Sequence, residues 1–104
     1  MLRTILVLAV LLVGYAAPAL ADDVDNAYRL GETARKAGFA NDFEVSGSAS
    51  TIDIFMGTTR TADAQAAADG LCRFGREKMT WVGSWSVRTF LVVGDRPAAV
   101  CSIK

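Results

Sequence analysis

Histidine is absent from all 104 residues of the sequence, and cysteine occurs only twice, as Cys72 and Cys101. Without histidine the chain lacks the commonest general base, the usual activator of a nucleophile and the commonest metal ligand. The two cysteines do not form a Cys-x-x-Cys redox pair. We therefore expect a protein that is not an enzyme and that binds no cofactor or metal; a histidine-free enzyme is the less favoured alternative.

Other motifs of ligand-binding sites are missing as well. Asp22–Asn26 carries three aspartates, but alanine and tyrosine follow where an EF-hand loop requires glycine. Ser46–Ser50 lacks the spacing and the lysine of a phosphate-binding loop. Glu44 and Asp53 would form a pair of carboxylates if their strands adjoined, although outward-facing acidic residues are usually solvated.

The first 21 residues have the pattern of a secretory signal peptide. Arg3 precedes an apolar run from Ile5 to Tyr15, and Ala19–Ala21 is a small-x-small cleavage site. The alternative is an uncleaved membrane anchor, but Gly14 and Pro18 interrupt the segment that would have to span the bilayer. Residues 1–21 are thus the predicted signal peptide and residues 22–104 the mature domain.

Export determines where the mature protein works. No cysteine stands near position 22 to be lipidated, so we expect a mature protein that is not embedded in a membrane. The short signal with its small-x-small end suits a periplasmic protein, and a secreted, extracellular protein is the alternative. In an oxidising compartment Cys72 and Cys101 should form a disulfide. The loop closed by that disulfide would stabilise a domain of this size by about 3–4 kcal/mol in the chain-entropy model.

Hydrophobic periodicity predicts a small α+β domain. The predicted elements are a helix over Asp22–Ala37, a short strand or loop over Phe43–Val45, a strand over Thr51–Met56, a helix from Ala62 to about Arg76, and strands over Trp85–Val93 and Ala98–Ile103. Asp22 or Asp23 is a candidate cap for the first helix, and Thr61 for the second. We expect two helices packed on one face of a three- to four-stranded, mostly antiparallel sheet in the order α-β(β)-α-β-β.

The disulfide restricts the register of the last two strands. Because the Cα atoms of bridged cysteines lie within about 7 Å of each other, Cys101 must face the helix that carries Cys72. A two-residue turn would turn Cys101 to the wrong side of the sheet. We therefore predict an odd loop, such as Gly94–Arg96, or a β-bulge, with Cys101 opposite Thr89.

The alternation of side chains along residues 85–93 predicts two different faces for this strand. Trp85, Val87, Thr89, Leu91 and Val93 should contact the helices. The back of the sheet would then carry Arg88, Phe90, Val92 and Val100. Residues 39–50 either cover this back face or leave it available to a partner or a second copy of the chain.

Basic residues are concentrated after Gly70, whereas acidic residues predominate before it. Either the two halves neutralise each other in the folded domain, or the basic segment binds an anionic partner. Trp81 lies among these basic residues and is a better candidate for exposure than Trp85. The candidate partner surface consists of Arg73, Arg76, Trp81, Arg88, Phe90 and Val100.

Two functions remain open from the sequence. The first is an exported, non-catalytic binding protein whose partner is a protein or an anionic component of the cell envelope. The second is an accessory or inhibitor protein that docks a specific envelope protein, with a homodimer also compatible with the apolar back face. Export argues against nucleic acid as the partner.

Overall fold

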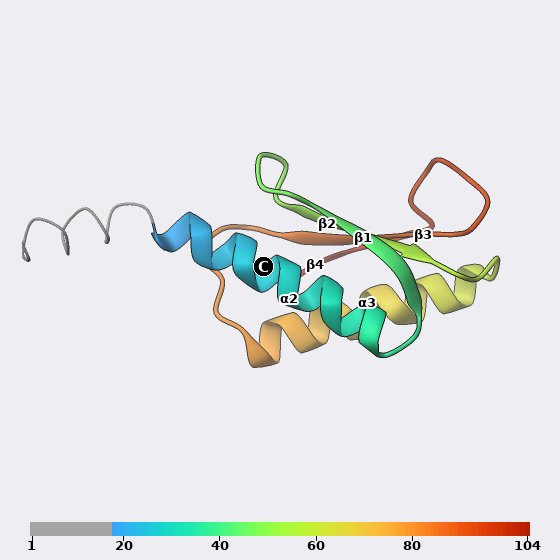
Figure 1. The fold of residues 1–104 in the computed structure, drawn as a ribbon, viewed down its shortest axis with the longest axis horizontal. Helices are drawn as coiled ribbons and strands as arrows, with labels where there is room; N and C mark the ends of the chain where they lie inside the picture. The colour runs from blue at the N-terminus through green and yellow to red at the C-terminus, as the bar shows by residue number, and fades with distance from the viewer. Residues whose placement is uncertain (1–17) are drawn as a thin grey trace, which may run out of the picture.

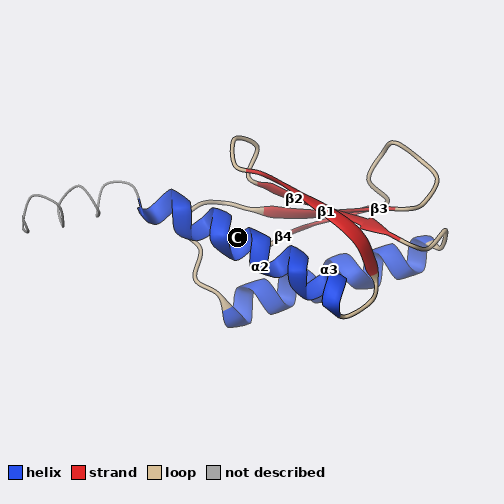
Figure 2. Cartoon of the chain, in the orientation of Figure 1, coloured by secondary structure: helices blue, strands red, loops and turns tan. Residues whose placement is uncertain are grey.

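The structure, a computed structural model, describes residues 18–104 and has two helices and four strands in this range. The elements are α2 (Pro18–Lys36), β1 (Ala40–Ser46), β2 (Thr51–Met56), α3 (Thr61–Lys78), β3 (Ser86–Phe90) and β4 (Ala99–Ser102). Both helices lie on the same side of the sheet (Figures 1 and 2). The predicted α+β class and the order of its elements are confirmed, and the uncertain segment around Phe43 is a strand.

The strands lie side by side in their sequence order, β1-β2-β3-β4. β1 and β2 form an antiparallel hairpin, and so do β3 and β4. β2 and β3 are parallel, because α3 connects them and returns the chain to the starting end of the sheet. The sheet is therefore mostly antiparallel, with one parallel pair at its centre.

Alternation along the strands separates a covered face from an open face. Ile52, Ile54 and Met56 of β2 are buried against the helices, whereas the residues between them are only partly buried. Val87 continues the covered face on β3, and Leu30 of α2 packs into the same cluster. The core thus lies between the helices and one face of the sheet.

The first helix begins earlier than predicted. It starts at Pro18 and so includes the predicted cleavage site after Ala21. Residues 1–17, which make up most of the predicted signal peptide, lie outside the described part of the chain. Between residues 18 and 104, neither helix is long and apolar enough to cross a membrane.

The second helix begins without the predicted cap. Arg60 is the N-cap residue of α3, and its side chain makes no capping hydrogen bond, so the assignment of Thr61 as the cap is wrong. Instead, the side chain of Thr58 makes two hydrogen bonds at the start of this helix. Its Oγ1 accepts the N–H of Arg60 at 3.1 Å and donates to Asp63 Oδ2 at 3.0 Å.

In the last hairpin Cys101 lies on the predicted face of the sheet, but the loop between the strands is longer than predicted. β3 ends at Phe90, and the chain returns through a loop over residues 91–98 rather than a tight turn. Cys101 pairs with Val87 and not with Thr89, so the register is two residues away from the prediction. An odd number of residues still separates Thr89 from its partner Ala99, which leaves Cys101 on the covered face.

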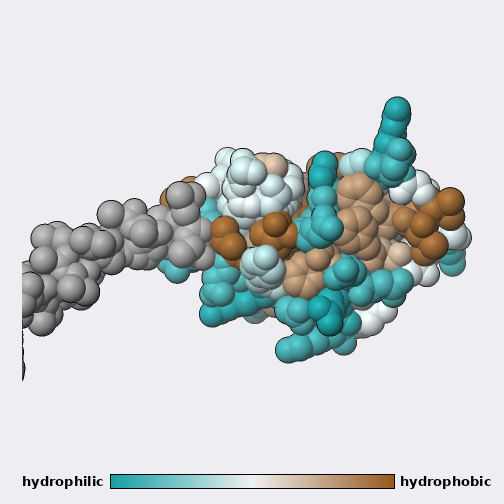
Figure 3. Space-filling model, turned by 45° about the horizontal axis from the view of Figure 1, so that its top comes forward, coloured by the Kyte–Doolittle hydropathy of each residue, from teal (hydrophilic) through white to brown (hydrophobic). Residues whose placement is uncertain are grey.

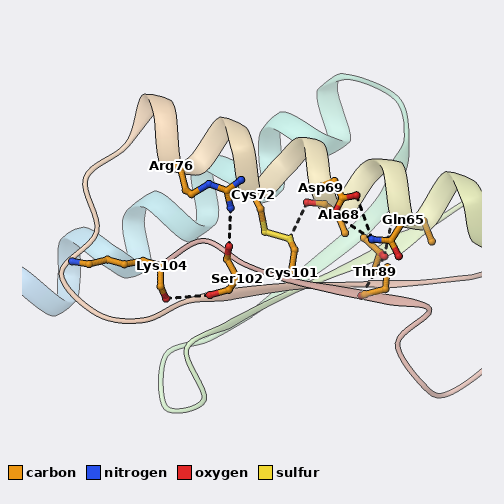
Figure 4. The surroundings of a disulfide bond; sticks show 11 residues. Gln65, Ala68, Asp69, Cys72, Arg76, Thr89, Cys101, Ser102 and Lys104 are labelled. Carbon is orange, nitrogen blue, oxygen red and sulfur yellow. Dashed lines mark hydrogen bonds between the residues drawn. A yellow bond between two sulfur atoms is a disulfide. The ribbon is translucent and has the colours of Figure 1, made fainter.

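The disulfide between Cys72 of α3 and Cys101 of β4 is present, with 6.4 Å between the Cα atoms. Figure 4 shows it bridging the helix and the edge strand, with Arg76 beside it. The Arg76 guanidinium donates to the carbonyl of Ser102 at 2.8 Å. The edge strand β4 is therefore attached to α3 both covalently and by a charge-assisted hydrogen bond.

Candidate binding surface on the open sheet face

In residues 18–104 no helix covers the second face of the sheet, which we call the open face (Figure 2). The pairing register places side chains of all four strands on it in rows. One row runs across β1 to β4 through Glu44, Asp53, Arg88 and Val100. The adjacent row contains Asp42 and the two phenylalanines of the central strands, Phe55 and Phe90.

An ion pair occupies the centre of the open face. Arg88 Nε donates to Asp53 Oδ1 at 2.7 Å, and Arg88 Nη2 donates to Asp53 Oδ2 at 2.7 Å. This two-pronged geometry joins adjacent parallel strands and fixes both side chains. The hydrogen bond and the charge of Asp53 raise the pKa of Arg88 and outweigh the opposing effect of burial. Arg88 thus stays charged, and its charge is neutralised within the protein.

Aromatic packing supports the ion pair. The rings of Phe55 and Phe90 stack with their centroids 5.3 Å apart, and the guanidinium carbon of Arg88 lies 5.5 Å from the centroid of Phe90. An arginine over a ring face is attracted by the ring's electrons. Phe90 is buried in this packing although it lies on the side of the sheet without helices. Contacts within the domain therefore fix the side chains at the centre of the open face.

Val100 lies next to Arg88 on the open face, and two further valines are exposed in the loop between β3 and β4. Val100 of β4 is 55% exposed, and Val92 and Val93 of the 91–98 loop are 60% and 74% exposed. Figure 3 looks obliquely onto this side of the molecule, where brown apolar atoms lie among teal polar ones. The expectation that Val93 faces the helices is wrong, because the strand ends before it.

The predicted partner residues do not form one surface. The structure places Arg88, Phe90 and Val100 together on the open face. Arg73 and Arg76 instead project from α3, on the other side of the sheet. Trp81 is 5% exposed and Trp85 3%, so both are buried and the expectation that Trp81 is available to a partner is wrong. Its indole N–H donates to the carbonyl of Gly75 at 3.0 Å.

Trp85 is buried as predicted, and it belongs to a network that the sequence did not reveal. The carboxylate of Asp23 accepts the N–H groups of Val82 and Gly83, at 2.9 and 2.8 Å, and the indole N–H of Trp85 at 3.1 Å. Asp23 is therefore not the predicted helix cap. Its position near a helix start gave the same local signal as a cap, and only the tertiary contact distinguishes the two.

The two carboxylates that the sequence singled out as a possible pair lie on the open face. Glu44 and Asp53 are cross-strand neighbours, as the sequence left open, but Asp53 is bound by Arg88. Within residues 18–104 no group of three or more cysteine, aspartate or glutamate side chains could hold a metal ion. The open face thus combines an internally satisfied ion pair with the exposed apolar side chain of Val100.

Comparison with known proteins gives no match: no family model, no curated protein and no solved structure is significantly similar to this chain. The function proposed below therefore depends on the geometry of the domain alone.

Proposed function

We propose that this chain is an exported, non-catalytic binding protein that docks a protein partner on the open face of its sheet. The observation that carries the proposal is the exposed Val100, which lies next to the Asp53–Arg88 pair on the open face, with Val92 and Val93 also exposed in the loop that joins β3 to β4. Exposed apolar side chains on a sheet face that no helix covers are a feature of interaction sites. Export is part of the proposal, because a disulfide-bonded domain of this size suits an oxidising compartment.

The charges on the open face favour a protein over an anionic envelope component. Arg88 is its only cationic residue among the outward strand positions, and Asp53 already neutralises it. Asp42 and Glu44, both exposed, lie at the β1 edge of the same face. An anionic polymer would be repelled there. A protein that contacts the surface mainly through apolar side chains would complement the exposed valines.

The test compares two exposed valines in a binding experiment. Val100→Glu places a charge on the open face, whereas Val82→Glu places one on a valine of similar exposure, 60%, outside that face. The mature, oxidised protein is immobilised and exposed to its own envelope extract. We expect one protein to be retained by the wild type and by Val82→Glu and lost with Val100→Glu, with little change between low and high salt.

Other results would identify a different function. Retention of the same protein by Val100→Glu would exclude the open face as the docking site. Release of the partner by moderate salt would indicate an anionic ligand of the basic residues instead. A dimer in sedimentation equilibrium that Val100→Glu dissociates would make the partner a second copy of the chain.

A further inference from the structure

The two edge strands of the sheet differ in how well they resist pairing with another chain. β1 has a bulge between Ala40 and Asp42, and its acidic residues Asp42 and Glu44 are exposed. Bulges, charged side chains and prolines are common means by which an edge strand avoids further pairing. Apart from its short length, β4 has none of these features, since its sequence is Ala-Val-Cys-Ser and its register with β3 is regular. β4 is therefore the edge that another strand can join.

The backbone groups that β4 directs to its free edge follow from its pairing with β3. The N–H of Ile103 donates to the carbonyl of Trp85 at 2.8 Å. In an antiparallel pair every second residue hydrogen-bonds to the neighbouring strand, so Val100 and Ser102 direct their N–H and C=O groups away from β3. The carbonyl of Ser102 accepts a hydrogen bond from Arg76 and has a second lone pair for another donor. The free edge thus presents two N–H groups and two carbonyls.

The position of α3 over the sheet suits a second copy of the domain at this edge. α3 packs on β3 and β4 alike, because Thr89 of β3 donates to the carbonyl of Ala64 at 2.9 Å and the disulfide joins β4 to the same helix. If a second copy continued the sheet at β4, two strand spacings of about 4.8 Å would separate the two α3 helices. The resulting distance of about 10 Å is that of packed helices. Sheet twist of roughly 20–25° per strand would cross them at about 40–50°, near the commonest packing angle.

The side of α3 that adjoins β4 carries charges of both signs. Figure 4 shows Gln65 and Asp69 on this side, along the helix from the disulfide. The carboxylate of Asp69 accepts hydrogen bonds from the neutral amide of Gln65, at 3.2 and 3.3 Å, and Arg73 is exposed one turn further along. Within residues 18–104 neither Asp69 nor Arg73 forms an ion pair. Each copy therefore presents one carboxylate and one guanidinium whose charges are not neutralised.

The disulfide sets the level of these charges relative to β4. Cys101 is bonded to Cys72, and its Sγ lies 2.9 Å from the carbonyl of Ala68, so Cys101 lies level with the turn of α3 between these two residues. The midpoint between Asp69 and Arg73 falls in the same turn. A twofold axis at Cys101 would therefore place Asp69 of each copy opposite Arg73 of the other.

We propose that two copies of this domain pair antiparallel through β4, with the twofold axis at Cys101, and join their four-stranded sheets into one. Val100 of each copy exchanges backbone hydrogen bonds with Ser102 of the other, and Asp69 of each copy forms an ion pair with Arg73 of the other. Extension of the sheet leaves the open face uncovered in both copies. The dimer therefore does not depend on the protein partner proposed above.

The test measures the dimer dissociation constant of the mature, oxidised protein by sedimentation equilibrium at low salt. Asp69→Arg and Arg73→Asp each replace two symmetric attractions by repulsions and should raise this constant about tenfold. An equal mixture of the two variants should dimerise about as tightly as the wild type, because each reversed charge then meets its opposite. The matched control is Arg29→Asp, which reverses an exposed arginine four residues after an aspartate on α2, over β1 and β2, and should leave the constant unchanged.

Hydrogen exchange locates the interface without any substitution. The amides of Val100 and Ser102 should exchange more slowly as the protein concentration rises through the dissociation constant, whereas the β1 amides should not change. A wild type that is monomeric at about 1 mM would overturn the proposal. So would a dimer that neither charge reversal weakens, or a mixture of the two variants that stays monomeric. Retention of a partner on the open face is measured separately with Val100→Glu, so either proposal can fail without the other.

Discussion

Two glycines in the middle of helices have opposite roles at the scale of single residues. In α2, a Cβ on Gly31 would overlap the ring of Phe43, which lies directly on the helix backbone. Phe43 also meets Tyr28 edge-on, with 5.9 Å between the ring centroids. Gly31 therefore allows β1 to approach α2 closely. Gly70 in α3 faces a groove between α2, α3 and the turn after β2, where the same substitution would meet nothing.

Alanine substitutions should separate these roles. Gly31→Ala should lower the free energy of unfolding by about 1–3 kcal/mol, because the cost of displacing the Phe43 ring exceeds the gain in helix propensity. Gly70→Ala should raise it by about 0.5–1 kcal/mol. Urea denaturation of both variants measures the difference. A Gly31→Ala variant as stable as the wild type would show that Phe43 moves away without cost.

At the scale of elements, the sequence predicted those whose pattern reflects burial on one face. The alternation of β2 and the stripe of small residues on α3 located both elements within one or two residues. The apolar run through Val93 was misleading because it continues after the sheet ends. There the N–H of Val92 donates to the carbonyl of Thr58 at 3.0 Å, a contact from another loop that no local pattern reveals.

For the open face, the sequence predicted which strand residues lie on it but not how they interact. Alternation placed Arg88 and Val100 on the face away from the helices, as observed. It could not show that Asp53 neutralises Arg88, because that pairing depends on the order of strands in the sheet. The groove was also missed, since its lining comes from α2, the turn after β2 and α3, which only the fold brings together.

The disulfide should matter most for the edge strand. β4 has four residues, and apart from its pairing with β3 it is attached to α3 by the disulfide and by Arg76. Replacing Cys72 and Cys101 together by alanine should lower the free energy of unfolding by about 2–4 kcal/mol. Hydrogen exchange should accelerate first at the β4 amides. Uniform acceleration across the sheet would contradict a local role of the bridge.

At the scale of the whole molecule, Asp23 joins the start of the domain to its end. Asp23 is 1% exposed, and its carboxylate binds the loop after α3, while Asn26 of the same helix donates to the carbonyl of Thr80 at 2.9 Å. Lys104 adds a contact from the C-terminus, with its Nζ donating to the carbonyl of Trp81 at 2.7 Å. The loop before β3 is thereby fixed to α2 by groups far apart in the sequence.

Burial by itself would raise the pKa of Asp23. The hydrogen bonds from Val82, Gly83 and Trp85, together with the charge of Lys104, outweigh it, so the pKa lies below its ordinary value. A carboxyl group with a lowered pKa stabilises the folded state fully above its unfolded pKa, about 3.9 for aspartate. This stabilisation is lost as the pH falls through the lower folded pKa.

Asp23→Asn should therefore have an effect that depends on pH. At pH 7 the amide presents donors to groups that also donate, and we expect a loss of about 2–4 kcal/mol in the free energy of unfolding. Below about pH 4 the gap from the wild type should narrow, because protonation removes the same charge from the wild type. Urea titrations at several pH values, followed by the fluorescence of Trp81 and Trp85, measure the loss at pH 7 and its change with pH.

Asp25→Asn is the control, since the exposed carboxylate of Asp25 forms an ion pair with Arg29, an interaction of under about 1 kcal/mol. A gap that stays constant down to low pH would show that Asp23 acts through its shape and not through its charge.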